Sequence, residues 1–248
     1  MLTIAGTARF ISDLHLRAER PDLTERFATF LADTAVAGTE ALFILGDLVE
    51  YWIGDDDLAA PFNAQVCKLL RALADRGTRI FFIAGNRDFL IGETFAAAAG
   101  IHRLHELEKV GAGDTASLLM HGDTVCTDDI PYQEFRRMVR SPDWQRTFLA
   151  RPLSERRAEV ENLRRRSAEA MQGKMAAIMD ANNASICEAL TAHGCTRLIH
   201  GHTHRPGHEM IQLASGSAER WVLSDWDSGR GDALEISAAG VRRIDLSR

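Results

Sequence analysis

Histidine, carboxylate and asparagine side chains follow several short apolar runs of this sequence. Residues 200–204 read His-Gly-His-Thr-His and come directly after the apolar pair Leu198 and Ile199. Three histidines within five residues at the end of a strand place several imidazole ligands close together. That arrangement suits two metal ions side by side better than one. Four other apolar runs end in metal-capable residues, which are Asp13 with His15, Asp47, Asn86 and His121.

These side chains have the composition of a dinuclear metal site. Two divalent cations about 3.5–4 Å apart are held by a shared carboxylate and several further oxygen or nitrogen donors. Neighbouring strands lie about 4.8 Å apart, so groups at adjacent strand ends fall within reach of one another. Carboxylate, amide and imidazole donors without thiolate suit Mn²⁺, Fe²⁺ or Zn²⁺. The expected metal ligands are Asp13, His15, Asp47, Asn86, His121, His202 and His204.

A simpler interpretation exists for each of these residues taken singly. An Asp or Asn often ends a strand without any further role, and a histidine often has an ordinary place in a surface or core. Five strand ends that all carry ligand-type residues favour the metal site over that interpretation. No Ser-His-Asp or Cys-His arrangement stands out, so we expect no side-chain nucleophile.

Short apolar strands and amphipathic helices alternate along the chain. Asp22 and Glu25 resemble a capping box after Pro21, and Pro61 opens a second helix that Gly77 closes. The alternation predicts α/β layers with ligands at the carboxyl ends of the strands. We expect strands at 10–12, 41–45, 79–84, 117–120 and 197–199, helices at 93–99 and about 181–193, and closing antiparallel strands at 221–223, 234–236 and 241–244.

Residues 128–180 lack any strand signal and predict an inserted helical lobe within a core of residues 1–127 and 181–248. Between residues 136 and 166, ten arginines stand against four acidic residues. Such a basic lobe would suit a substrate with two phosphates or an anionic membrane surface. Its apolar residues, including Trp144 and Phe148, would suit an apolar slot. The alternative is a helical hairpin with a solvated charged face and its own small core.

Composition narrows the class of protein. The length of 248 residues suits one large α/β domain with an insertion, and the net charge of −6 argues against nucleic acid as a partner. Four cysteines without C-x-x-C spacing indicate a reducing compartment. We find neither a leader nor an apolar run near the ~20 residues that span a bilayer. We therefore expect a cytoplasmic protein, at most docked on a membrane face.

The metal-capable residues stand in motifs that resemble the signature of the calcineurin-like metallophosphoesterases: Asp-x-His at 13–15, Gly-Asp at 46–47, Gly-Asn at 85–86, His121 and Gly-His-x-His at 201–204. The resemblance implies a two-layered β-sandwich flanked by helices, with two metals bridged by a carboxylate and a hydroxide. It implies one metal on Asp13, His15, Asp47 and His204. The other metal would bind Asp47, Asn86, His121 and His202, with Asp47 as the bridge.

Arg87 departs from the wider superfamily, which usually has a histidine there that is thought to protonate an alkoxide leaving group. Arginine stays charged at physiological pH and is no useful general acid, but it binds phosphate oxygens well. A phosphate monoester, with a second pKa of about 6, can leave without a proton. The residue therefore favours cleavage of a diphosphate linkage. The alternative is a surface arginine beside a turn.

Longer stretches resemble one family of that superfamily, the UDP-2,3-diacylglucosamine pyrophosphohydrolases of bacterial lipid A synthesis. The most specific are Trp-Ile-Gly-Asp-Asp-Asp at 52–57 and Gly-Asn-Arg-Asp-Phe-Leu at 85–90. The resemblance implies hydrolysis at the UMP-proximal phosphorus, giving UMP and 2,3-diacylglucosamine 1-phosphate, with two Mn²⁺ ions per chain. It also implies a helical lid at 128–180 with a cavity for two acyl chains. We expect a monomer, peripherally bound to the cytosolic face of the bacterial inner membrane.

The same resemblance implies roles for individual residues. Those that would serve catalysis are Asp47, Asn86, Arg87 and His121. Substrate contacts would be Asn86, Arg87, Asp129, Ser167, Lys174 and His202, whereas Met171 stands where the family tends to have Asn and is not carried over. Another enzyme of the superfamily, a phosphodiesterase or dinucleoside polyphosphate hydrolase with a soluble substrate, is the alternative. A non-catalytic scaffold would have lost ligands, and none of the seven is missing.

Overall fold

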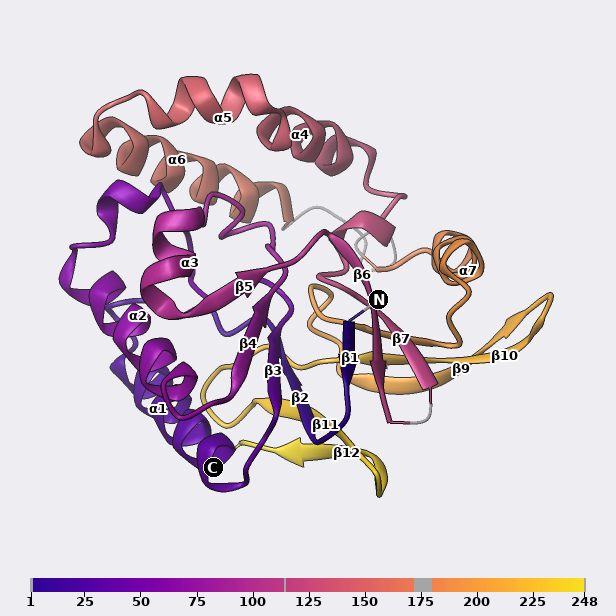
Figure 1. The fold of residues 1–248 in the computed structure, drawn as a ribbon. Coiled ribbons are helices and arrows are strands. Elements are labelled where there is room, and N and C mark those ends of the chain that lie inside the picture. Colours follow the sequence, from indigo (N-terminus) through magenta and orange to yellow (C-terminus); the bar gives the residue numbers. More distant parts are fainter. Residues whose placement is uncertain (1, 114, 172–179, 248) are drawn as a thin grey trace.

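Two six-stranded sheets face each other in the computed structural model, which describes residues 2–113, 115–171 and 180–247 (Figure 1). The predicted two-layered sandwich flanked by helices is confirmed. The first sheet has the strand order β12 (Gly240–Asp245), β11 (Asp232–Ser237), β2 (Ala8–Ile11), β3 (Ala41–Ile44), β4 (Arg79–Phe82) and β5 (Ile101–Arg103). The second has the order β1 (Leu2–Ile4), β6 (Leu107–Ala112), β7 (Thr115–Met120), β8 (Arg197–His200), β10 (Gly216–Val222) and β9 (Gly207–Leu213).

Parallel strands form the centre of the first sheet. β2, β3 and β4 pair in parallel, and apart from Arg9 and Arg79 their side chains are apolar on both faces, as is usual for strands covered on both sides. Between the two sheets, Phe43 stacks on both Phe10 and Phe81 with ring centroids 4.9 Å apart in each pair. On the opposite face, Leu42 and Phe82 pack into the core beneath the helices. The carboxyl ends of these strands therefore reach the same edge of the sheet.

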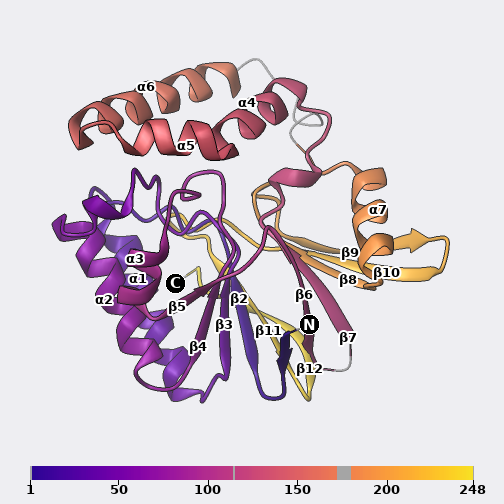
Figure 2. The ribbon, with the colours of Figure 1, turned by 45° about the horizontal axis from the view of Figure 1, so that its top comes forward.

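Three helices cover the outer face of the first sheet, namely α1 (Pro21–Val36), α2 (Pro61–Ala74) and α3 (Glu93–Ala99) (Figure 2). Each of the first two begins at the proline that the sequence indicated. The predicted capping box at Asp22 and Glu25 is wrong, because no side chain caps α1 and Asp22 instead accepts both forks of the Arg20 guanidinium. On the second sheet, α7 (Asn183–His193) packs through Ile186 and Leu190.

Strand prediction was incomplete. Four strands were not predicted, because they are short or carry exposed and half-exposed side chains: β1, β5, β6 and β9. The two closing strands β11 and β12 are antiparallel as expected. The expected strand at 221–223 is the end of β10, which pairs antiparallel with β9 and parallel with β8.

Three helices of the inserted stretch lie over one end of the sandwich (Figure 2): α4 (Ile130–Arg140), α5 (Pro142–Leu149) and α6 (Leu153–Met171). Trp144, Phe148 and Val160 anchor them in the core beneath α1–α3. The division into a core of 1–127 and 181–248 with an insertion at 128–180 stays a prediction. Among the described residues, we find no helix with the length and apolar character that a membrane span requires.

Candidate metal centre

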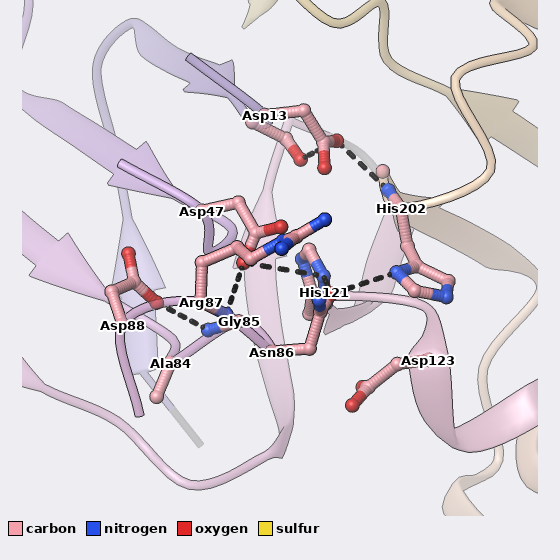
Figure 3. Close-up of polar contacts among 12 residues, drawn as sticks. Asp13, Asp47, Ala84, Gly85, Asn86, Arg87, Asp88, His121, Asp123 and His202 are labelled. Atoms are coloured by element: carbon pink, nitrogen blue, oxygen red, sulfur yellow. Dashed lines mark hydrogen bonds and ion pairs between the residues drawn. The ribbon is translucent and has the colours of Figure 1, made fainter. Parts of the chain in front are cut away.

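All seven expected ligands lie in loops that follow the carboxyl ends of parallel strands. In the first sheet these loops follow β2, β3 and β4; in the second they follow β7 and β8, which also pair in parallel. The ends of the two sheets meet, and Figure 3 shows the side chains of Asp13, Asp47, Asn86, His121 and His202 gathered around one centre. The structure thus brings together Asp13, His15, Asp47, Asn86, His121, His202 and His204.

One side of this centre is formed by Asp13, His15 and His204, whose ligand-type atoms lie within 4.8 Å of one another. The Nε2 atoms of the two histidines are 3.3 Å apart. Asp13 Oδ1 lies 3.4 Å from Nε2 of His204 and 4.0 Å from Nε2 of His15. Asp47 approaches the same side, with its Oδ2 3.9 Å from Nε2 of His15.

The other side is formed by Asn86, His121 and His202. Oδ1 of Asn86 lies 2.9 Å from Nε2 of His121 and 3.0 Å from Nδ1 of His202. Asp47 Oδ1 lies 3.7 Å from Nε2 of His121. The two carboxylate oxygens of Asp47 therefore face different sides of the centre, which suits a carboxylate that bridges two metal ions.

Backbone strain is concentrated at these ligand-type residues. Among the described residues, every non-glycine residue with positive φ belongs to the expected ligand set. A left-handed conformation costs a non-glycine residue roughly 1–3 kcal/mol and persists only where the surroundings enforce it. Such strain clusters at functional sites. The residues are Asp13 (φ 54°), His15 (48°), Asp47 (52°), His202 (67°) and His204 (53°).

Two glycines allow the backbone to pass close to the carboxylates of the centre. A Cβ atom on Gly85 would collide with the carboxylate and backbone nitrogen of Asp47, and one on Gly201 would collide with Ser12 and the carboxylate of Asp13. Any side chain at either position would push a carboxylate out of the centre. Both positions therefore require glycine for close approach of the backbone.

Neighbouring groups fix the orientation of three of the four imidazoles through their Nδ1 atoms. A second partner of this kind is usual for metal-binding histidines, because it sets the tautomer and aims the other nitrogen at the metal. In these three, Nε2 faces the centre, whereas His202 faces it with Nδ1. The contacts join His121 to the Leu45 carbonyl at 2.8 Å, His15 to Glu50 at 3.6 Å and His204 to Asp225 at 3.5 Å.

The electrostatics of the centre favour a bound cation. Burial raises the pKa of Asp47 to about 6 and lowers the pKa of His15 and of His202 to about 4. Burial opposes protonation of His121 too, but the charges of Asp47 and Asp13 outweigh it and raise that pKa to about 8. His15 and His202 are therefore neutral near pH 7, the form in which imidazole binds metal. Burial thus leaves the Asp47 carboxyl short of positive charge, whereas the histidines around Asp13 outweigh its burial and hold the pKa of that carboxyl well below its usual value.

The donor set fits divalent metal ions. Asp13 is fully buried, and its Oδ1 has no hydrogen-bond partner among the described residues. A buried carboxylate oxygen without a partner is costly unless a cation satisfies it. The donors around it are carboxylate, amide and imidazole groups, which suit Mn²⁺, Fe²⁺ or Zn²⁺.

Residues 7–206 match the family described as calcineurin-like phosphoesterase. A UDP-2,3-diacylglucosamine hydrolase from Aromatoleum aromaticum is 49% identical over 220 residues, which cover 89% of both chains. One from Chromohalobacter salexigens is 45% identical over 238 residues, 96% of both chains. The chain belongs to the UDP-2,3-diacylglucosamine hydrolase family of calcineurin-like phosphoesterases. Both resemblances inferred from the sequence motifs are thereby confirmed.

Solved structures agree with this family on the fold. An archaeal phosphodiesterase matches with a TM-score of 0.50 at 11% identity, covering 96% of this chain and 99% of its own. A dimetal phosphatase from Danio rerio matches with a TM-score of 0.51 at 10% identity, covering 98% and 99%. At such identities the likeness concerns the sandwich architecture alone.

Carboxylates behind the ligands were not singled out in the sequence. Asp88 accepts hydrogen bonds from the backbone nitrogens of Gly85 at 2.8 Å and Leu48 at 2.7 Å, so it ties the loops after β3 and β4 together (Figure 3). Burial and the charge of Asp47 raise the pKa of Asp88 to about 7. Its position in the Gly-Asn-Arg-Asp run was the available signal, but an Asp in a turn has many roles.

Asp123 is a second carboxylate of this kind. It lies in the short 3₁₀ helix η2 (Asp123–Val125) and accepts hydrogen bonds from the Tyr132 hydroxyl at 3.0 Å and from Nε of Arg136 at 2.7 Å. Both donors belong to α4, so Asp123 joins this helix to the loop that carries His121. Burial opposes its ionisation, but nearby cationic side chains hold the pKa of Asp123 well below its ordinary value.

Arg87 extends from the loop after β4 into the space beside Asp47 (Figure 3). Its backbone nitrogen donates to Oδ1 of Asp47 at 2.9 Å, and its carbonyl accepts from the backbone nitrogen of Trp52 at 3.0 Å. Its Nε is buried without a hydrogen-bond partner among the described residues. The guanidinium is thus held beside the centre with a free donor.

The structure describes the other three expected substrate contacts to different extents. Asp129 is buried and caps α4 by accepting a hydrogen bond from the backbone nitrogen of Tyr132 at 3.2 Å. Ser167 belongs to α6, at a position whose side chain is outside the described part, and Lys174 lies outside the described residues. Substrate binding by these three stays a prediction.

A cavity of about 590 Å³ opens beside the centre between α4–α6 and the loops of the core. Asn86, an expected ligand, and Arg87 are among its lining residues. Its walls include the apolar side chains of Phe89, Phe135, Met138, Trp144, Phe148 and Leu163. An apolar slot among the basic helices, one of the two alternatives for the inserted stretch, is therefore present.

The Trp-Ile-Gly-Asp-Asp-Asp run holds these helices in place. Asp55, in the short helix η1 (Asp55–Asp57), accepts hydrogen bonds from the backbone nitrogens of Gly92 and Phe95 at 2.9 Å each, at the start of α3. Asp56 pairs with Arg156 of α6, whose side chain is 1% exposed. The motif thus connects α3 and α6 to the loop that follows β3.

Proposed function

We propose that this protein hydrolyses the diphosphate bond of UDP-2,3-diacylglucosamine and releases UMP and 2,3-diacylglucosamine 1-phosphate. One observation carries the proposal: a large apolar cavity is lined by Asn86, one of the expected metal ligands, and by Arg87 beside the centre. Such a site suits a substrate with an apolar part attached to phosphates. The name of the Aromatoleum and Chromohalobacter relatives supports the same substrate.

Two Mn²⁺ ions are the proposed cofactors. Bound there, they would polarise the phosphoryl group and lower the pKa of an attacking water toward neutrality. Asp13, His15, Asp47 and His204 would hold one ion. Asp47, Asn86, His121 and His202 would hold the other, and the division of Asp47 oxygens between the two sides supports this assignment.

Arg87 has a separate role in the proposal. Its guanidinium binds phosphoryl oxygens and stabilises the charge that develops on them during cleavage. It donates no proton, because arginine remains charged at physiological pH. The leaving group must therefore depart unprotonated, as a phosphate monoester can.

The inserted helices serve as a lid that binds the lipid half of the substrate. In this proposal, the acyl chains occupy the apolar cavity, while Asp129, Ser167, Lys174 and His202 contact the polar part. The protein binds peripherally at the anionic cytosolic face of the inner membrane. Exposed Ile130 and Met138 on α4, together with exposed Arg137, support that association, since apolar and basic side chains on one helix suit such a surface.

Turnover by the purified protein tests the proposal. We expect release of UMP from UDP-2,3-diacylglucosamine in detergent micelles with Mn²⁺ and none after chelation, with about two Mn²⁺ bound per chain by elemental analysis. Dinucleoside polyphosphates should be cleaved poorly. Cleavage of the soluble dinucleotides with no release of UMP from the lipid would contradict the proposed substrate.

A further inference from the structure

A second, smaller cavity of about 190 Å³ lies beside the candidate metal centre. Among its lining residues are His15 and His204, which belong to the side of the centre opposite Asn86 and His202. Only Glu50 and Arg87 line both this cavity and the large apolar one, among the residues described as lining either. The ligand cluster therefore has an apolar cavity toward Asn86 and a separate cavity toward His204.

Charged side chains line the smaller cavity, and some of their polar atoms have no hydrogen-bond partner among the described residues. Arg17, with 35% of its side chain exposed, donates from Nη1 to Glu50 at 3.1 Å. Within the described part of the chain, its other guanidinium nitrogens have no partner. Asp227, 60% exposed, accepts from Arg20 Nη1 and from the Ser228 backbone nitrogen at 2.7 Å each, both on Oδ1. Its Oδ2 has no hydrogen-bond partner among the same residues; the hydrogen bonds from Arg20 and the Ser228 backbone and, more weakly, the charge of Arg17 lower the pKa of this carboxyl.

We propose that the smaller cavity binds the nucleotide half of the substrate, a pyrimidine nucleoside monophosphate. This inference rests on the proposed function. A lipidated nucleoside diphosphate sugar has an apolar part and a nucleoside part on opposite sides of its diphosphate. With the diphosphate at the metal centre and Arg87, and the acyl chains in the apolar cavity, the nucleoside lies on the remaining side, toward His15 and His204.

The chemistry of the walls matches that ligand. The free forks of Arg17 bind phosphate oxygens or base carbonyls, as guanidinium groups commonly do. Oδ2 of Asp227 accepts a hydrogen bond from a ribose hydroxyl, the role of an acidic side chain in many nucleotide sites. Ligand pockets that enclose a drug-sized molecule have volumes of about 300–1,000 Å³. At about 190 Å³, this cavity encloses part of the nucleotide and leaves the rest at the surface.

Separate binding of the two products tests this assignment. Isothermal titration calorimetry on the Mn²⁺-loaded protein would measure the Kd of UMP and the Kd of detergent-solubilised 2,3-diacylglucosamine 1-phosphate. Arg17→Ala and Asp227→Ala should each raise the Kd of UMP about tenfold, the effect of one hydrogen bond to a charged group. The Kd of the lipid product should stay unchanged.

Matched controls are Arg71→Ala and Asp75→Ala, an exposed ion pair on and just after α2 that lines neither cavity. They should leave both constants unchanged. UMP affinity at the wild-type value in both cavity variants, or no UMP binding by the wild type, would overturn the inference. The proposed function fails in a different way: the wild type would bind UMP but release none from the lipid substrate.

Discussion

Five ligand-type residues of this centre have left-handed backbone conformations, which non-glycine residues rarely adopt. Asp47 shows the consequence best. With φ 52° it follows Gly46 directly, sits 2% exposed, and divides its two carboxylate oxygens between the two sides of the centre. At the scale of single residues, backbone strain is thus found at five of the seven residues that we propose as metal ligands.

Asp47→Ala should abolish turnover, because it removes the one carboxylate that faces both sides of the centre. We expect activity at least about 10³-fold lower, a loss of bound Mn²⁺, and a folded protein. UMP release, elemental analysis and circular dichroism measure these three properties. Asp33→Ala, at an exposed position of α1, is the control. A variant at Asp47 that turned over at the full rate would show that the bridge has been misassigned.

Arg87→Ala should slow the reaction without emptying the centre. Loss of one charged group that stabilises a transition state typically costs about 10²–10³ in kcat. Arg87→Lys should recover only part of the rate, since an ammonium lacks the planar fork. Bound Mn²⁺ should stay at the wild-type content in both variants. Depletion of metal from Arg87→Ala would instead make the residue part of the metal site.

At the scale of elements, the attachment of α6 to the core rests on an asymmetric ion pair. Arg156 is 1% exposed and also donates to the Ile53 carbonyl at 2.5 Å, whereas Asp56 is 57% exposed. Removal of Asp56 leaves a buried cation without its carboxylate. Removal of Arg156 leaves a carboxylate that water can solvate.

Asp56→Ala should therefore destabilise the protein more than Arg156→Met. An uncompensated buried charge costs about 3–5 kcal/mol, while an apolar replacement of the buried partner is close to neutral. Urea unfolding followed by circular dichroism gives both free energies of unfolding. Equal losses of unfolding free energy in the two variants, or a larger loss for Arg156→Met, would contradict this prediction. The burial of Arg156 would then not determine how much the ion pair contributes to stability.

Strong local signals made some elements predictable. The prolines at 21 and 61 start α1 and α2, the run 93–99 matches α3, and the helical pattern after Asp128 matches α4–α6. β1, β5, β6 and β9 were missed, because their hydrophobic side chains are few and only their sheet partners define them. Local patterns carry no information on partners distant in sequence.

The candidate site likewise contains residues that the sequence predicts and residues that it does not. Its seven ligand-type residues were predictable, since each follows an apolar strand in a short motif. Asp88, Asp123 and Asp225 were not, because each acts through contacts outside its own motif: with Leu48, with two residues of α4 and with His204. Which cavity lies on which side of the centre also depends on the packing of the two sheets and the inserted helices.

At the scale of the whole molecule, ion pairs attach the inserted helices to the core beside the centre. Ion pairs attach them at both ends of the large cavity: Arg136 and Arg140 of α4 pair with Glu106 at 2.8 and 2.9 Å, and Arg164 of α6 pairs with Glu50 at 2.9 Å. Glu50 also contacts His15 at 3.6 Å. Glu50 therefore contacts both a helix that lines the apolar cavity and a ligand-type residue of the centre.

Filling the apolar cavity should change lipid preference and leave the chemistry intact. Leu163→Trp places a larger ring on the wall that α6 contributes, at a residue that is none of the seven expected ligands. We expect kcat/KM for the long-chain substrate to fall at least tenfold, because a longer acyl chain loses more of its apolar contact. An analogue with shortened acyl chains should lose much less, and bound Mn²⁺ should not change. Val36→Trp, at an 84% exposed position of α1, controls for the added ring. Equal losses for both chain lengths would place the acyl chains elsewhere, because steric filling of their binding site must discriminate by length.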